Sequence, residues 1–359
     1  MRKRLKDRCA RRITAICSTL ALSLALAAAA LVHPALAQDK AEGVTSFEGK
    51  QIRMIVGSAP GGGYDLYART VAAHLRQHLP GNPTIVVQNM PGAGSLVPAN
   101  YLYNVAPKDG TVIGAIDPLI STDPLFYPDR AKFDPRQFGW IGSALRETHV
   151  GVVWQTSPIK TFDDVFKNEL VVAGTGGSTN LYPTFVDGLL GTRIKVISGY
   201  NGTKQGMLAV ERGEVGGEVG ITWASLKATN GEWLHDGKLR VFAQFGLKRQ
   251  PDLPDISLVY DYARNADEKA AMNLMFANQE FGRPFVAPPG VPAPVLATLR
   301  EAFAATMTDP DFLADAKRLA LDIDPTSGEE VQSIVENIFN TSPATVQKVE
   351  AILNDTAKN

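Results

Sequence analysis

Cysteine is almost absent from this chain of 359 residues, which has only Cys9 and Cys17. Both lie in an N-terminal segment that we expect to be removed, so the mature chain would have none. That absence excludes a disulfide scaffold, a cysteine nucleophile and a thiolate metal site. Whatever chemistry the mature protein performs must come from other side chains or from its backbone.

The first 37 residues have the organisation of an export signal. Seven Lys and Arg residues precede the apolar stretch Ile13–Val32, and Ala35-Leu36-Ala37 ends it with the small-x-small pattern of a signal peptidase site. We therefore predict cleavage before Gln38 and a location in the periplasm. An uncleaved membrane anchor is the alternative, which the small-residue ending disfavours.

Long apolar runs and excess positive charge are also missing beyond residue 37. No later run approaches the ~18 residues needed to span a bilayer. Removal of residues 1–37 leaves 29 basic and 36 acidic residues, a formal charge of −7, which gives no reason to expect nucleic-acid binding. The remaining 322 residues (359 less 37) exceed what one core usually holds, so two domains are expected.

Strands and helices alternate along the mature chain. Apolar runs predict strands at 52–56, 84–87, 111–116, 150–154, 170–173, 195–197 and 239–244. Helical spacing separates them, which indicates β-α-β crossovers and a largely parallel sheet in the first half. Beyond a strand and loop at 285–292, the chain from Pro294 onward is expected to be helical, and 272–283 fits no clear pattern.

Two glycine-rich segments, 115 residues apart, share one arrangement. Each follows a predicted strand and leads into a helical segment, and Asp65 is well placed as the N-cap of the first helix. Such a turn presents bare amides and the positive end of a helix dipole, which favours an anion. We therefore predict a ligand held from two sides, whereas the alternative is that the glycines only permit tight turns. The segments are Gly61-Gly62-Gly63-Tyr64-Asp65 and Gly176-Gly177-Ser178-Thr179-Asn180.

Several side chains near these loops are candidates for a pocket. Aromatic rings with polar tips suit a pocket wall, although core packing is an equal explanation for Tyr67 and Tyr182. Glu218 lies in a strand-like segment and faces either a cleft or water. Asp65 is either consumed by its helix or free to meet a donor on the ligand. The aromatic candidates are Tyr64, Tyr67, Tyr182, Tyr200 and Trp223.

Other kinds of site fit the residues poorly. The first loop lacks the Gly-Lys-Ser/Thr ending of a P-loop, and Thr179 replaces the last glycine of a dinucleotide fingerprint. No Gly-x-Ser-x-Gly elbow supports a hydrolase. His74 and His78 are four residues apart and form a conceivable metal pair, but such a pair is more often a solvated helix face, and no third ligand lies nearby in the sequence. We expect no cofactor and no metal.

A set of motifs spread over nearly the whole mature chain resembles the tripartite tricarboxylate transporter receptors, the Bug or TctC-like extracytoplasmic solute-binding proteins. The resemblance implies an α/β, two-domain periplasmic-binding-protein fold (type II-like) with mainly parallel sheets flanked by helices. It implies a ligand cleft between domain 1 (45–147 plus 279–359) and domain 2 (148–278). The motifs are Pro-Gly-Gly-Gly-Tyr-Asp-Leu-Tyr-Ala-Arg (60–69), Asn-Met-Pro-Gly-Ala-Gly (89–94), Gly-Thr-Gly-Gly-Ser-Thr (174–179), Gly-Tyr-Asn-Gly (199–202) and Ala-Pro-Pro-Gly-Val-Pro (287–292).

The same resemblance implies a receptor, and not an enzyme. It would be a monomer that captures a small organic carboxylate and delivers it to the membrane subunits of a tripartite transporter. Departures from the family pattern, such as Gly63-Tyr64 in the first loop and Glu218 in place of an Asp, leave the ligand open. A periplasmic sensor feeding a signalling kinase and a periplasmic hydrolase remain alternatives. The predicted ligand-binding residues are Gly61, Gly62, Gly63, Tyr64, Asp65, Thr175, Gly176, Gly177, Ser178, Thr179, Asn180, Tyr200 and Glu218.

Overall fold

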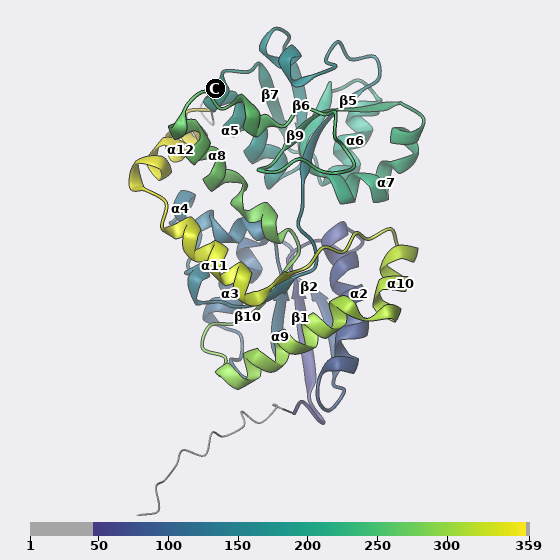
Figure 1. The fold of residues 1–359 in the computed structure, drawn as a ribbon, viewed down its shortest axis with the longest axis vertical. Helices are drawn as coiled ribbons and strands as arrows, with labels where there is room; N and C mark the ends of the chain where they lie inside the picture. Colours follow the sequence, from purple (N-terminus) through teal and green to yellow (C-terminus); the bar gives the residue numbers. More distant parts are fainter. Residues whose placement is uncertain (1–45, 357–359) are drawn as a thin grey trace, which may run out of the picture. The chain divides into compact units, whose positions relative to one another are not determined.

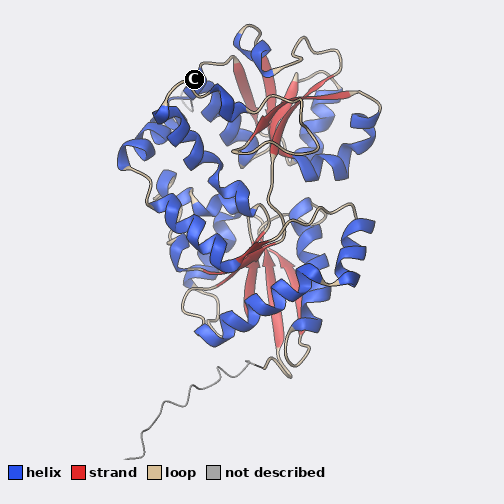
Figure 2. Ribbon diagram, viewed as in Figure 1, coloured by secondary structure: helices blue, strands red, loops and turns tan. Residues whose placement is uncertain are grey.

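The computed structural model describes residues 46–356, and of Asp355 and Thr356 only the backbone. The predicted export signal, its cleavage before Gln38 and both cysteines lie outside the described residues. No helix within the described residues is long and apolar enough to cross a membrane. The described chain forms two mixed β-sheets, each flanked by helices (Figures 1 and 2).

The first sheet has six strands in the order β11-β4-β10-β3-β1-β2. β1 pairs in parallel with β2 and β3, through crossovers that contain α2 (Gly63–His78) and α3 (Leu96–Asn104). β10 lies antiparallel between β3 and β4, so a late segment of the chain completes the middle of this sheet. The strands are β1 (Gln51–Val56), β2 (Thr84–Asn89), β3 (Val112–Ala115), β4 (Gly139–Ser143), β10 (Pro284–Ala287) and β11 (Thr326–Ser327).

The second sheet has five strands in the order β7-β6-β8-β5-β9. β6 pairs in parallel with β7 and β8, whereas β5 runs antiparallel to both β8 and β9. Unlike the first sheet, it is built from one continuous stretch of sequence. The strands are β5 (His149–Trp154), β6 (Leu170–Gly174), β7 (Ile194–Ser198), β8 (Gly217–Thr222) and β9 (Leu239–Phe245).

Helices cover both faces of each sheet. On the first sheet, α2, α9 (Ala293–Thr308) and α10 (Pro310–Arg318) enclose one apolar core, and α3 and α11 (Gly328–Phe339) enclose the other. On the second sheet, α5 (Ser178–Leu190), α8 (Ala266–Phe276) and α12 (Pro343–Thr356) cover one face, and α6 (Thr203–Glu211) and α7 (Trp223–His235) cover the other. Figure 1 shows these helices against their sheets.

The predicted strands are confirmed, and so is the α/β class with two helix-flanked sheets. Both sheets are mixed and not mainly parallel, because β5, β10 and β11 pair antiparallel with their neighbours. The expectation of helix alone beyond Pro294 is wrong, because the two-residue strand β11 pairs with β4. The unassigned segment 272–283 forms the end of α8 and the short helix η6 (Ala277–Phe281). The helix α12 contacts α5 and α8, so the last helix joins the core of the second sheet. The division into 45–147 plus 279–359 and 148–278 stays a prediction.

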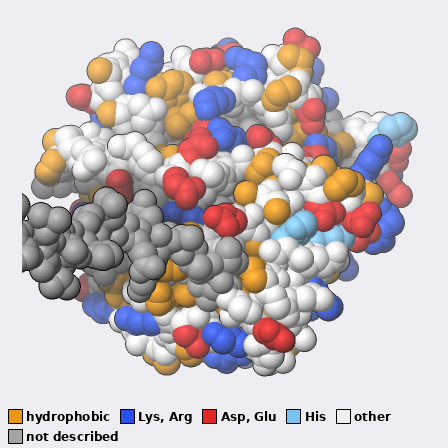
Figure 3. Space-filling view, turned by 60° about the horizontal axis from the view of Figure 1, so that its bottom comes forward, with side chains coloured by type: hydrophobic (Ala, Val, Ile, Leu, Met, Phe, Trp, Pro, Cys, Tyr) orange, Lys and Arg blue, Asp and Glu red, His pale blue; other side chains and the backbone are white. Residues whose placement is uncertain are grey.

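Acidic and basic side chains are interspersed on the face of the molecule shown in Figure 3. On the part of that face not covered by grey atoms, apolar side chains occur among them without a broad area of one charge. Mixed charge of this kind produces no strong single-sign field there.

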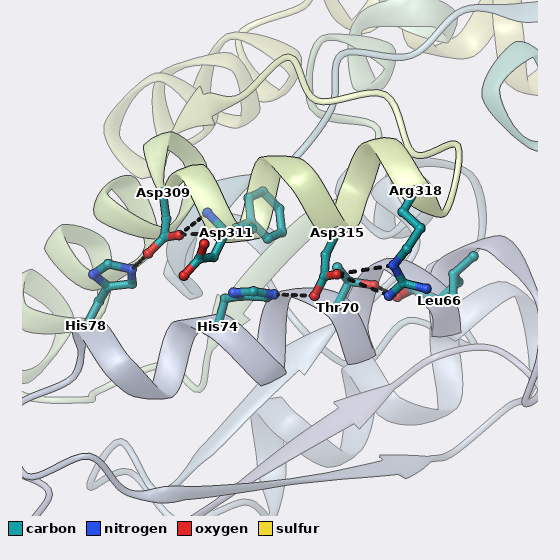
Figure 4. Close-up of polar contacts among 9 residues, drawn as sticks. Leu66, Thr70, His74, His78, Asp309, Asp311, Asp315 and Arg318 are labelled. Atoms are coloured by element: carbon teal, nitrogen blue, oxygen red, sulfur yellow. Dashed lines mark hydrogen bonds and ion pairs between the residues drawn. The ribbon is translucent and has the colours of Figure 1, made fainter.

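Two histidines of α2 attach this helix to α10 (Figure 4). His74 Nε2 lies 2.9 Å from Asp315 Oδ2, and His78 Nε2 lies 2.8 Å from Asp309 Oδ2. Asp309 also caps α10, because its Oδ1 accepts the amides of Asp311 and Phe312. The histidines therefore bind different carboxylates, and the described part of the chain has no group of three or more His, Cys, Asp and Glu residues that could hold a metal ion.

The docking of α10 gives a test of this packing. Phe312 is fully buried in the core between α2 and α10, whereas the adjacent Leu313 is 41% exposed. We expect Phe312→Ala to lower the free energy of unfolding by about 3–5 kcal/mol, because it removes buried apolar surface and leaves a cavity. The control Leu313→Ala should change it by less than about 0.5 kcal/mol. Equal losses in denaturant titrations of the two variants would show that α10 does not pack as described.

Candidate ligand-binding site

The first glycine loop, Gly61–Asp65, connects the end of β1 to α2. Gly62 is the N-cap of α2 and has no side chain to satisfy the first-turn amides. Among the described residues, no acceptor is bonded to the amides of Gly62, Gly63 and Tyr64. The positive end of the α2 dipole and its bare N–H groups therefore lie together at this loop.

Asp65 is not the N-cap that the sequence predicts, because it is the third residue of α2. Its carboxylate accepts hydrogen bonds from the Gly61 amide (2.8 Å), Arg69 Nε (3.0 Å) and Asn89 Nδ2 (2.8 Å). Burial alone would raise the pKa of Asp65, but these bonds outweigh it and hold the pKa below its ordinary value. The Asp65 carboxylate thus stabilises the loop through the bond to Gly61, and it already accepts hydrogen bonds from three donors of the chain.

Tyr64 and Gly63 of the first loop lie close to Arg283 and to the start of α7. The guanidinium carbon of Arg283 lies 4.2 Å from the centroid of the Tyr64 ring. A Cβ atom on Gly63 would come within 2.9 Å of Ser225 Oγ, at the start of α7. The first loop therefore lies beside a helix that covers the second sheet.

The second loop, Thr175–Asn180, connects β6 to α5. Gly176 (φ +104°) and Gly177 (φ +55°) adopt backbone conformations that favour glycine. Ser178 Oγ donates to the Gly220 carbonyl (2.8 Å), and the Gly176 amide donates to Asn180 Oδ1 (3.3 Å). Among the described residues, no acceptor is bonded to the amides of Gly177 and Ser178.

The second loop also lies close to a short helix that follows a strand of the first sheet. A Cβ atom on Gly177 would lie 3.7 Å from Leu119 Cδ1, in the short helix η2 (Pro118–Ser121) after β3. Each glycine loop therefore lies at a helix N-terminus and close to a helix that is connected to the other sheet: Gly177 is near Leu119, and Gly63 is near Ser225.

Glu218 and Tyr200 are the predicted site residues outside the loops. Glu218 of β8 is fully buried, and its Oε1 lies 3.3 Å from Thr175 Oγ1 of the second loop. The sequence left it facing a cleft or water, and the structure places it away from water. Tyr200 precedes α6 and packs against the core on the α6 and α7 face of the second sheet.

Arg283 is a central residue that the sequence reasoning missed. Its side chain is 2% exposed and forms an ion pair with Glu147, whose side chain is 1% exposed. Glu147 lies in the segment that connects β4 to β5, and Arg283 immediately precedes β10, so the pair joins two of the segments that run between the sheets. A Cβ atom on Gly282 would lie 2.3 Å from Glu147 Cβ, so glycine permits this close approach.

The Arg283 guanidinium also links both sides of the site. Its Nη2 donates to Ser225 Oγ (3.3 Å) and lies 3.5 Å from Thr222 Oγ1, at the N-terminus of α7. It contacts the Tyr67 ring (5.1 Å to the centroid) as well as that of Tyr64. Desolvation makes such cation–π contacts stronger than at exposed sites. An arginine flanked by apolar residues, as in Phe281-Gly282-Arg283-Pro284-Phe285, was the signal available in the sequence.

Burial perturbs the ionisation of several groups around this pair. It raises the pKa of Glu147 to about 7, although the Arg283 charge opposes the rise. It raises the pKa of Asp117, which precedes η2, to about 6, against the bond from the Leu119 amide. Burial also lowers the pKa of His149 to about 3, so this imidazole is neutral at ordinary pH. Such clusters of perturbed groups are typical of functional sites.

Comparison with known proteins supports one family. Residues 67–351 match the family model described as "Tripartite tricarboxylate transporter family receptor". Among curated proteins, the chain is similar to the UPF0065 protein in the gbd 5′ region of Cupriavidus necator. The two are 26% identical over 300 residues, which cover 80% of this chain and 84% of that protein.

Solved structures share the fold. The periplasmic binding protein BugD has a TM-score of 0.64 at 23% identity, and the alignment covers 86% of this chain and 97% of BugD. The MatC protein of Rhodopseudomonas palustris with bound malate has a TM-score of 0.58 at 17% identity, covering 84% and 99% of the two chains. The two-sheet architecture is therefore that of periplasmic binding proteins.

The buried ion pair predicts a specific pattern of stabilities. We expect Arg283→Met to lower the free energy of unfolding by about 3–5 kcal/mol, because Glu147 then stays buried without its partner. Removal of the Arg283 charge raises the pKa of Glu147 further above about 7, so this loss should grow as the pH rises above about 7, where Glu147 ionises in the natural protein but stays protonated in the variant. Denaturant titrations at several pH values measure both effects.

The double variant Arg283→Met/Glu147→Leu is the control. It removes both charges, so it should recover most of the stability that the single variant loses. If the double variant is no more stable than Arg283→Met, the ion pair does not account for the loss.

Proposed function

This chain belongs to the tripartite tricarboxylate transporter receptor family, and we propose that it is a periplasmic receptor for a small organic carboxylate. In this proposal the receptor holds the acid between two lobes and delivers it to the membrane subunits of a tripartite transporter. The protein acts as a monomeric binding protein, and not as an enzyme.

The observation that carries this proposal is the pairing of two uncapped helix N-termini. α2 and α5 both begin at glycine, and their bare amides belong to the first and second loops. Helix N-termini bind carboxylates through N–H groups and the helix dipole, without a charged side chain. The Arg283 guanidinium beside Tyr64 adds positive potential at the first loop. Malate, the ligand bound to MatC, is an acid of this class.

This proposal gives two roles to residues of the predicted site. The amides of Gly62, Gly63, Tyr64, Gly177 and Ser178 bind the carboxylate groups. Side chains of the same loops hold those amides in place: Asp65 through Gly61, and Asn180 through Gly176. Gly61, Gly176, Thr175, Thr179, Tyr200 and Glu218 complete the predicted set.

Closure of the two lobes is the proposed conformational step. We place the hinge at 144–148 and 278–283, the segments joined by the pair of Glu147 and Arg283. A ligand that contacts both loops binds the closed form better than the open form, and that difference drives closure. The proposed lobes are 45–147 plus 279–359 and 148–278, with α12 of the first range packed against α5 and α8 of the second. Export with cleavage before Gln38 places the receptor in the periplasm, and mass spectrometry of the secreted protein tests the cleavage.

A thermal-shift screen of the protein from Gln38 onward tests the proposed function. The panel holds malate, succinate, adipate, citrate and benzoate. An acid at 100 times its dissociation constant adds about 2.7 kcal/mol to stability, which raises Tm by a few degrees for a chain of this size. No shift with any carboxylate, for protein from which bound small molecules were first removed, would contradict the proposal.

The loops predict a loss of binding without a loss of fold. Gly62 has φ −84°, and a Cβ atom there would meet nothing closer than the Ala59 carbonyl at 3.6 Å. We therefore expect Gly62→Val to fold normally and to weaken binding at least 100-fold, because the side chain would obstruct the approach to the amides. Isothermal titration with the acid found in the screen measures the change.

Gly231→Val is the matched control, because Gly231 lies in α7 with no atom within 4 Å of its added Cβ. It should bind like the natural protein. Unchanged binding by Gly62→Val would place the ligand elsewhere. Uptake of the acid in cells that lack the transporter membrane subunits tests the delivery step, which requires those subunits.

A further inference from the structure

Glu218 is a buried acid without a charged partner. It lies on β8, fully buried, between the second loop and α6. Among the described residues its Oε2 has no hydrogen-bond partner, and a Cβ atom on Gly206 of α6 would lie 2.7 Å from that oxygen. Its Oε1 lies 3.3 Å from Thr175 Oγ1. An ionised carboxylate in such a place is costly unless it is paired.

The hydroxyl protons of the second loop show which group supplies the last hydrogen bond. Thr179 Oγ1 donates to the Gly176 carbonyl (2.8 Å), which uses its only proton. The single Thr175 hydroxyl proton can serve either the 2.9 Å contact with Thr179 Oγ1 or the 3.3 Å contact with Glu218 Oε1, but not both. Three contacts therefore share two hydroxyl protons, and a neutral Glu218 supplies the third.

This chain of hydrogen bonds ends at the peptide that carries a candidate binding amide. Thr179 holds the Gly176 carbonyl through both its hydroxyl (2.8 Å) and its amide (3.3 Å). In a trans peptide the carbonyl and the following N–H point in opposite directions. A fixed Gly176 carbonyl therefore fixes the direction of the Gly177 amide.

We propose that Glu218 is a positioning residue, a neutral carboxylic acid whose proton bonds Thr175 and thereby fixes the second loop in its ligand-binding conformation. The effect of Glu218 on ligand binding rests on the proposed function, in which the Gly177 amide binds the carboxylate of the ligand. Glu218 itself contacts the loop and not the ligand.

The surroundings of Glu218 favour the neutral form. Opposite it, β5 presents Val152, and β6 has no charged residue. The charged residues of α6, Lys204 and Glu211, are exposed, and Asp187 of α5 is bonded to Thr192 and the Ile194 amide. His149, at the other end of β5, is neutral and lies against Tyr182. Burial raises the pKa of Glu218 to about 8.

Ionisation of Glu218 would undo the arrangement. A carboxylate can only accept, so Thr175 would turn its proton toward Glu218 and release Thr179. A negative charge would also remain, without a partner, beneath a loop that binds anions. Ligand affinity should therefore fall as the pH rises through about 8, by up to tenfold for each further pH unit.

Nuclear magnetic resonance of the ligand-free protein from Gln38 onward tests the proposal directly. Glutamate side chains are labelled with ¹³C and glycines with ¹⁵N, and Glu218→Gln identifies the Glu218 signal. We expect the carboxyl to be protonated at pH 6.5 and to titrate near pH 8, and the Gly177 amide to shift with it. In Glu218→Gln, which keeps a donor and loses the charge, the Gly177 amide should stay constant with pH.

Substitutions of Thr175 separate positioning from simple burial. Thr175→Val removes the hydroxyl and should uncouple the Gly177 amide from the titration of Glu218, whereas Thr175→Ser should restore the coupling.

The pH dependence of folding stability gives a second test of the protonation state of Glu218. The raised pKa means that Glu218 costs stability as the pH rises from its unfolded value, about 4.3, to about 8. The Tm of Glu218→Gln should therefore exceed that of the natural protein increasingly over this range.

Two results would overturn the proposal. One is a Glu218 carboxyl already ionised at pH 6.5, and the other is a Gly177 amide that does not follow its titration. A binding arm uses malate and adipate, whose affinity should fall above pH 8 for the natural protein but not for Glu218→Gln. Failure of both acids to bind at any pH would count against these acids as ligands, while the ligand-free titration would still decide the role of Glu218.

Discussion

The pair of Arg283 and Glu147 is the interaction on which the rest of the site depends. Glu147 and Arg283 belong to two of the segments that run between the sheets, and both side chains are almost fully buried. Burying two charges costs several kcal/mol per ion, and only close pairing with further polar contacts offsets it. Those contacts come from the Tyr64 and Tyr67 rings on one side and from the hydroxyls at the start of α7 on the other. One guanidinium thus fixes the first glycine loop, both connecting segments and a helix of the second sheet.

Each glycine loop leads into a helix that has no side-chain cap, and each is supported by a carboxyl group in a different way. Asp65 accepts bonds from Gly61, Arg69 and Asn89, and these donors lower its pKa, so the first loop is held by an ionised acid. Glu218 has no such donors and is more deeply buried, which raises its pKa, so the second loop is held by a chain of hydroxyl protons. The environment, and not the residue type, decides which form each acid takes.

Local patterns in the sequence sufficed for most of the secondary structure and for both loops. A strand followed by glycines and a helix is specified by neighbouring residues, so β1 with α2 and β6 with α5 could be predicted. Features that depend on distant residues could not. Asp is a residue type that commonly caps helices, but the Asp65 carboxylate instead accepts hydrogen bonds from Arg69 and Asn89. Glu147 and Arg283 are far apart in the sequence, and the antiparallel entry of β10 and the docking of α12 on α5 depend on tertiary packing alone.

The position of β10 has a consequence for the order in which the protein folds. This strand lies between β3 and β4, so the middle of the first sheet is missing until Pro284–Ala287 arrives. The second sheet uses only residues 149–245 and needs no later strand. Contacts between distant parts of a chain form slowly, because loop closure must precede them. We therefore expect the second sheet to form early, while the first sheet waits as two separate pieces. The slow step of folding is then the insertion of one four-residue strand, which also brings Arg283 to Glu147.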